Sequence, residues 1–161
     1  MQGNRVALTG FFREPFPFAG QTVTRPGGRG AFVLTCSTSG EEVWGRGFAS
    51  NGRSIDVSSK GDVVVVGDSV TGDSIDGVPL PPVPPSAYNT SIFAASFESS
   101  NGRLRWARGF PSTGSGGADV DIDKQGLLSR GVGDFWGETD FGEGPVTPVP
   151  PSTGFVLGLA R

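Results

Sequence analysis

Three aspartates at alternate positions, Asp119, Asp121 and Asp123, form the pattern in this sequence most suited to binding a metal ion. Carboxylates at positions 1, 3 and 5 of a loop are typical of calcium sites. Here the glycine that should form the tight turn comes two positions late, at Gly126, and position 12 is Arg130 rather than glutamate. Apolar residues separate the aspartates, as in a half-buried strand. The pattern therefore predicts the solvated face of a strand and no metal or cofactor, with calcium as the alternative.

Catalytic chemistry has few candidate residues. The chain has no histidine, which excludes Ser-His-Asp and Cys-His devices and most zinc sites. Carboxylate pairs remain, at Glu41/Glu42 and at Glu138/Asp140. A glycosidase needs two carboxylates held several ångströms apart across a cleft, and linear spacing selects no such pair. We predict that the protein is not an enzyme, with a carbohydrate-active hydrolase as an alternative.

Composition and charge exclude further classes. The 161 residues carry a net charge of −3 and no basic run, so nucleic acid is not an expected partner. No segment approaches the roughly 18 apolar residues that span a bilayer, and the N-terminus lacks the charged start and apolar block of a secretory signal. The single cysteine, Cys36, lies in an apolar run and is predicted to be a small core residue.

The composition is that of a turn-rich, folded chain. Glycine (27) and proline (13) make up about a quarter of the residues, whereas charged residues are only 18% and aromatic residues 10%. The apolar residues come in short clusters, which indicates a globular domain made of short strands.

The chain repeats itself, and this is the strongest signal in the sequence. A shift of 123 residues aligns the segment from Gly10 to Thr35 with the segment from Gly133 to Gly158 without a gap. Half that distance brings in the middle of the chain: Trp44 and Trp106 lie 62 apart. Phenylalanines also recur at spacings of 61 and 62, at Phe32, Phe93 and Phe155. Repeats on this scale indicate a stacked or radial architecture.

Each repeat reads as four short strands, called a to d, and no segment has a capped helical period. We therefore predict an all-β protein without helices, built of four-stranded antiparallel blades like those of a β-propeller. The expected strands run in the order b-c-d, a-b-c-d, a-b-c: 5–9, 31–36, 42–48, 54–58, 62–66, 91–97, 103–110, 119–123, 127–132 and 154–160.

Motifs of the second and third repeats carry a family resemblance that covers nearly the whole chain. Trp-Ala-Arg-Gly-Phe at 106–110, Val-Asp-Ile-Asp-Lys-Gln-Gly at 120–126, Gly-Asp-Phe-Trp-Gly-Glu-Thr-Asp-Phe-Gly at 133–142 and Gly-Phe-Val-Leu at 154–157 are similar to the bacterial SBBP repeats. That resemblance implies a β-propeller fold and a cell-envelope or extracellular setting. It implies no particular activity. The proline-rich segment 78–86 departs from the pattern.

The strand count gives about two and a half blades in one repeat domain, 1–161, with blade-like units at 4–48, 53–110 and 118–161. Propellers usually close with four to eight blades. Three interpretations follow: a fragment of a longer propeller, a chain that forms a homo-oligomer through its open edge strands, or a compact packing without a ring.

Strand order predicts where a partner binds. In an antiparallel blade the b–c and d–a links lie on one side, and here these links are the long ones, so we expect a loop-rich binding face. The proposed binding residues are Tyr88, Trp136, Phe16 and Arg13, whereas Phe18 and Phe141 are interpreted as structural plugs. Trp44 and Trp106 occupy the same position of strand d in successive repeats and are expected to pack between blades. The predicted function is a non-catalytic interaction or structural module for a protein or polysaccharide partner; the alternative is a self-assembling unit.

Overall fold

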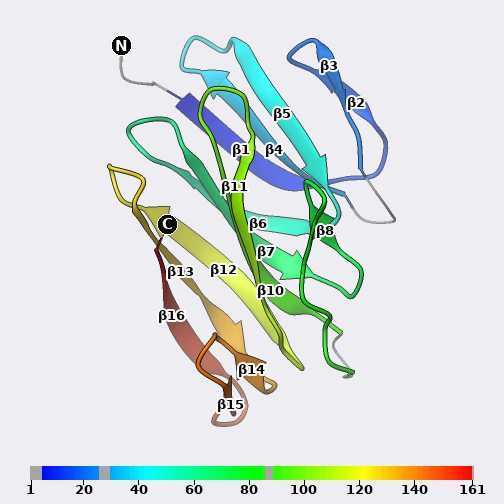
Figure 1. Ribbon diagram of the computed structural model, residues 1–161, viewed down its shortest axis with the longest axis vertical. Coiled ribbons are helices and arrows are strands. Elements are labelled where there is room, and N and C mark those ends of the chain that lie inside the picture. The colour runs from blue at the N-terminus through cyan, green and yellow to red at the C-terminus, as the bar shows by residue number, and fades with distance from the viewer. Residues whose placement is uncertain (1–4, 26–29, 86–88, 161) are drawn as a thin grey trace.

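The protein consists of β-strands arranged in small antiparallel sheets. The computed structural model describes residues 5–25, 30–85 and 89–160, and these residues contain no helix, hence none that could cross a membrane (Figure 1). Ten longer strands form three antiparallel sheets, and six short strands form three hairpins. The prediction of an all-β chain is confirmed.

Each of the three sheets is a meander. Within it, every long strand pairs with the next long strand along the chain. The first sheet has the order β1-β4-β5, with bounds Arg5–Phe12, Gly30–Ser37 and Glu42–Phe48. The second has the order β11-β10-β7-β6, where β6 is Asn51–Val57, β7 is Val63–Ser69, β10 is Ser91–Phe97 and β11 is Leu104–Phe110. The third has the order β12-β13-β16, with bounds Ser115–Ile122, Leu128–Phe135 and Thr153–Ala160. These strands follow the predicted order b-c-d, a-b-c-d, a-b-c.

Irregularities of the sheets repeat as well. The pairing of β6 with β7 shifts between Gly52 and Ser54, and that of β12 with β13 shifts between Gly117 and Asp119. These two bulges occupy the same place in successive sheets. Because a bulge lets a strand continue past an interruption of its alternation, β6 and β12 begin three and four residues earlier than the sequence predicted. The d–a link after β5 is consequently only residues 49–50, not the long link expected.

The b–c links are not plain loops either. Each contains a two-stranded hairpin that the sequence analysis missed: β2–β3 (Phe16–Phe18 and Gln21–Val23), β8–β9 (Ser74–Ile75 and Val78–Pro79) and β14–β15 (Thr139–Asp140 and Pro145–Val146). Strands of two or three residues carry too little periodicity to be recognised. Figure 1 shows the β2–β3 hairpin beside β5, and the other two hairpins farther down the molecule.

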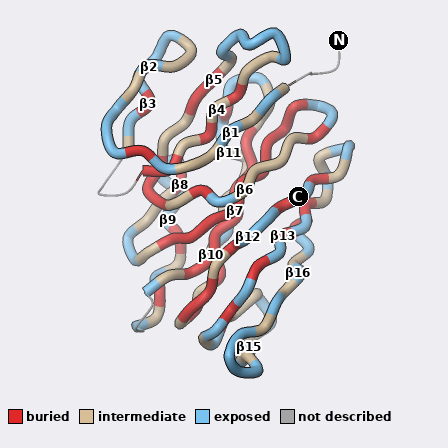
Figure 2. The backbone as a smooth tube through the Cα atoms, turned by 180° about the vertical axis from the view of Figure 1, so that it is seen from behind, coloured by how far each residue is buried: buried red, intermediate tan, exposed pale blue. Residues whose placement is uncertain are grey.

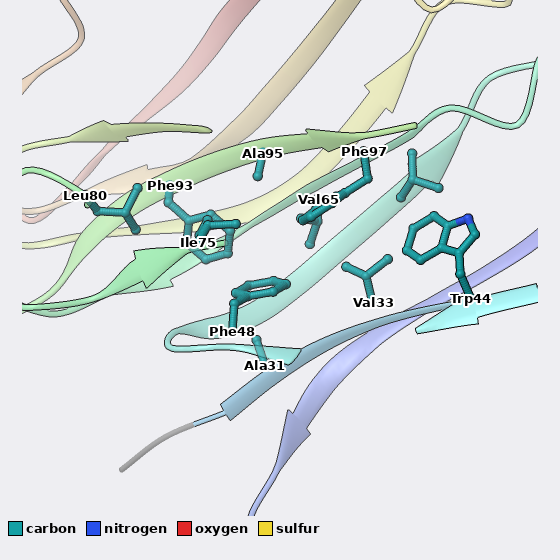
Figure 3. Close-up of a cluster of buried hydrophobic side chains, with 11 residues drawn as sticks. Ala31, Val33, Trp44, Phe48, Val65, Ile75, Leu80, Phe93, Ala95 and Phe97 are labelled. Atoms are coloured by element: carbon teal, nitrogen blue, oxygen red, sulfur yellow. The ribbon is translucent and has the colours of Figure 1, made fainter. Parts of the chain in front are cut away.

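The central sheet is buried on both sides. All residues of β7 and β10 are buried, as the continuous run of valines at 63–66 predicted (Figure 2). On the side of the first sheet, Trp44 and Phe48 of β5 pack against Phe93 and Phe97 of β10 (Figure 3). A second cluster joins the other side of the central sheet to the third sheet, through Val64, Val66, Ile92, Ala94, Phe110, Val120, Ile122 and Leu159.

The recurring phenylalanines have one structural role. Phe32, Phe93 and Phe155 each lie over a glycine of the neighbouring strand b, which is Gly10, Gly67 or Gly133. A Cβ atom at Gly67 would be 2.8 Å from the Phe93 ring, and one at Gly133 would be 2.8 Å from the Phe155 ring. The pairing of ring and glycine explains why both residue types recur together.

Trp44 packs between the first and second sheets, as predicted. Trp44 is buried, and its Nε1 donates a hydrogen bond to the carbonyl of Ser99 in the turn between β10 and β11, at 3.0 Å. Arg46 donates to two carbonyls of the same turn, those of Gly102 at 3.1 Å and Asn101 at 2.6 Å. In the second sheet the guanidinium of Arg108 lies over the ring of Trp106, 5.6 Å from its centroid.

Candidate functional site

The candidate site lies on the side of the molecule that carries the b–c and d–a links, which we call the loop face. It comprises links within residues 13–29, 49–50, 70–90, 111–114 and 136–152, with residues 26–29 and 86–88 outside the described structure. Tight turns join the strands at the opposite side. Links held on rigid sheets are the usual place for binding residues.

Two of the four proposed binding residues belong to the link of the first sheet. Phe16 packs edge-to-face on Phe12 and Phe32, with ring centroids 5.2 and 6.0 Å away, so it is a structural residue that anchors the β2–β3 hairpin. Its role as a binding anchor stays a prediction, because the ring is only half-buried. Arg13 is exposed just after β1. Tyr88 lies outside the described residues.

Trp136 is a predicted binding residue whose side chain reaches the surface of the structure. It follows β13, is 36% exposed, and is held in place by its backbone N–H, which donates to the carbonyl of Gly114 at 2.9 Å. Phe141, which follows Trp136 in the same link, packs on Phe110, Phe135 and Phe155. The interpretation of Phe141 as a structural plug is therefore confirmed, whereas Trp136 is a candidate binding residue.

Asp68 is a second candidate, which the sequence analysis did not identify. It lies near the end of β7, is only 8% exposed, and accepts a hydrogen bond from Arg53 Nε at 2.6 Å on its Oδ2 atom. Its Oδ1 atom is buried and has no hydrogen-bond partner. Buried carboxylate oxygens are nearly always hydrogen-bonded, so an unpaired one indicates a place where a donor is expected.

Asp68 and Trp136 come together at Gly116. A Cβ atom on Gly116 would be 3.5 Å from Asp68 Oδ1 and 3.7 Å from Cη2 of Trp136. The neighbouring Ser115 Oγ is also buried without a partner. We call Arg53, Asp68, Ser115, Gly116 and Trp136 the Asp68–Trp136 corner, which lies where the second sheet meets the third.

A network of buried hydroxyl groups supports this corner. Ser112 Oγ lies 2.6 Å from Thr139 Oγ1 and accepts the N–H of Gly114 at 3.0 Å, and Ser91 Oγ accepts the N–H of Ser112 at 3.0 Å. Because Gly114 in turn accepts the N–H of Trp136, the network fixes the backbone from which the indole projects.

The three aspartates of strand β12 and its turn have separate structural partners. A hydrogen bond from Ser54 and one from the backbone N–H of Val120 lower the pKa of Asp119. The backbone N–H of Leu127 lowers the pKa of Asp123. Asp121 lies 3.9 Å from Arg130. Within the described ranges no three acidic, cysteine or histidine side chains form a group able to hold a metal ion, so the geometry gives the calcium alternative no support.

One carboxylate of each pair considered for catalysis has a structural role. Glu42 accepts the N–H of Ala19 in the turn of the β2–β3 hairpin, at 2.6 Å. Asp140 Oδ1 accepts the N–H groups of Gly142 and Gly144 and so shapes the turn between β14 and β15. Cys36 is only half-buried, on the first sheet's side away from the second, which corrects its prediction as a core residue.

No protein-family model matches this chain, and no curated protein matches its sequence. The resemblance to SBBP repeats therefore stays a prediction, and the function has to be argued from the sheets and the Asp68–Trp136 corner themselves.

Proposed function

We propose that this protein is a non-catalytic interaction module of the β-propeller type, which presents its loop face to a protein or polysaccharide partner. The observation that carries the proposal is the Asp68–Trp136 corner. There a buried carboxylate oxygen without a partner lies beside a partly exposed indole.

The packing of the sheets supports a blade-like arrangement. Strand β6 lies against β1 on one side and against β12 on the other. Farther out, the bulky rings of Trp44, Phe48 and Phe97 fill the space between β5 and β10. Sheets that approach closely at one edge and are held apart by aromatic rings at the other are suited to an arrangement around an axis. The proposed setting, in the cell envelope or outside the cell, rests on the SBBP resemblance alone.

The chemistry of the corner suits a ligand with both donors and an apolar face. Asp68 Oδ1 can accept an O–H or N–H, and the ring of Trp136 can stack on C–H groups. Arg53, whose side chain is 56% exposed, is the group that can move to admit such a donor. Sugar hydroxyls beside a sugar ring offer this combination, so polysaccharides are the first probes.

The direct test is retardation of the purified protein in native gels that contain a panel of soluble polysaccharides. Trp136→Ala and Asp68→Ala are expected to remove retardation by any polysaccharide that retards the parent protein, without loss of the folded state. Val78→Ala, an exposed apolar residue elsewhere on the loop face, is the matched control and should be retarded like the parent. Equal retardation of all four proteins would contradict the proposed site.

Self-association is the second candidate function, and the outer side of the first sheet favours it. Val6 and Leu8 of β1 are about half exposed there, whereas Val63 and Val65, on the corresponding side of the second sheet, are buried against the first. An apolar sheet face of this kind can pack on a second copy of the chain.

A further inference from the structure

The third sheet lacks a strand that the other two possess. In the first sheet β5 pairs with β4, and in the second β11 pairs with β10. Strand β16 pairs with β13 on one side only, and no described strand lies along its other edge. The eight residues of β16 thus present a row of backbone groups to which another strand can add.

Two valines at equivalent repeat positions show which surface the missing strand would cover. Val23 of β3 is 2% exposed and packs on β5, since its Cγ2 is 2.9 Å from the place a Cβ on Gly45 would take. Its counterpart in the 123-residue repeat, Val146 of β15, is 48% exposed. The surface of Val146 is therefore the surface that a strand beside β16 would cover.

Trp106, the tryptophan of the second sheet, indicates the same missing strand. Trp44 and Trp106 occupy equivalent registers, opposite Thr35 and Ser96. Trp44 binds the turn that leads into the last strand of the next sheet. Trp106 instead lines an open pocket of about 410 Å³, together with Glu98, Arg103, Leu104, Arg105 and Arg108.

From these three observations we propose that β16, Val146 and the Trp106 pocket form a docking site for one added β-strand. Its occupant is a strand with the chain's own repeat sequence Trp-small-Arg-Gly-Phe. This docking site shares no residue with the Asp68–Trp136 corner.

The choice of occupant follows from the space beside β16. In the first sheet, Gly45 is enclosed by Val23, Leu34 and Phe18, so only a very small residue fits. The equivalent positions of the third sheet hold Val146, Leu157 and Phe141. A strand beside β16 therefore meets the same three side-chain types and needs a small residue at the same point, as β5 has with Gly45 and β11 with Ala107.

The test uses a synthetic peptide with the sequence of Glu42–Phe48, titrated into the full chain by calorimetry. Saturable binding is expected, with ~10-fold weaker affinity for Val146→Asp, because a carboxylate would be buried under the added strand. Val78→Asp is the matched control, since Val78 is 42% exposed in the hairpin of the second sheet, and it should bind like the parent. A peptide that carries Gly45→Val should not bind.

A fused form keeps the test decisive if the short peptide binds weakly. The same seven residues, joined after Arg161 through the turn sequence Ser-Ser-Asn-Gly, should raise the melting temperature above that of the fusion with Gly45→Val. Equal melting temperatures for the two fusions, or equal affinity of the peptide for parent and Val146→Asp, would overturn the proposal.

Discussion

The indole ring of Trp44 lies directly on Gly102, the glycine of the turn between β10 and β11, and its Nε1 donates to the carbonyl of Ser99 in the same turn. One side chain thus sets how the first sheet stands against the second. The turn can accept the ring only because Gly102 has no Cβ and adopts a positive φ of 67°.

Gly102→Ala is predicted to destabilise the protein by about 2–3 kcal/mol, because a methyl group would collide with the indole in addition to the strain of a positive φ. Gly40 is the matched control. It occupies the corresponding turn of the first sheet, has a φ of 89°, and has no atom within 4 Å of the place of a Cβ. Gly40→Ala should therefore cost only about 1 kcal/mol. Urea unfolding measures both, and equal losses would show that Trp44 does not constrain the turn.

The ion pair between Arg105 and Asp62 is predicted to matter more than that between Arg103 and Glu98. Arg105 Nη2 lies 2.8 Å from Asp62 Oδ1, and both side chains are largely buried. Removal of one partner leaves a buried charge, so Arg105→Met should cost about 2–3 kcal/mol. Arg103 is exposed, so its ion pair is screened by solvent and Arg103→Met should cost clearly less than Arg105→Met. Chemical unfolding of both variants checks the order, and a reversed order would contradict it.

Stability is predicted to fall in acid through Asp119. The Ser54 hydroxyl and the Val120 N–H lower the pKa of Asp119 in the folded state. A lowered pKa contributes stability that is present above the unfolded value, near 3.9, and lost as the pH falls through the folded one. Ser54→Ala should therefore lower the urea midpoint at pH 7 and have a smaller effect at pH 2. An equal effect at both pH values would exclude this linkage.

Self-association, if it uses the outer side of the first sheet, should depend on Leu8. Light scattering on a sizing column is expected to give a small multiple of 16.6 kDa for the parent and a single-chain mass for Leu8→Asp. Val78→Asp, a change of the same kind on the loop face, should keep the parent's mass. A monomeric parent would contradict the second candidate function.

The sequence alone predicted those features that recur in it. Phe32, Phe93 and Phe155 recur because each covers a glycine, and that regular spacing located the strands and their order. The bulges and the inserted hairpins escaped prediction, because a single irregular residue or a strand of two residues leaves no period to detect.

The candidate site was predictable only in part. Trp136 stood out because no other repeat has an aromatic residue there. Asp68 did not, because its importance depends on the meeting of β7 with Gly116 of another sheet. The packing of Phe16 on Phe32 was not predicted either, because it depends on where the β2–β3 hairpin lies against the first sheet.

The measurement that tests the central claim most directly is a nuclear magnetic resonance titration of the three indole N–H groups with a polysaccharide that retards the protein. The chain has only Trp44, Trp106 and Trp136, so each resonance reports one location. Binding at the loop face predicts a saturable shift of the Trp136 resonance, while those of the buried Trp44 and of Trp106 stay in place. An unmoved Trp136 resonance at saturating ligand would contradict the assignment of the Asp68–Trp136 corner as the binding site.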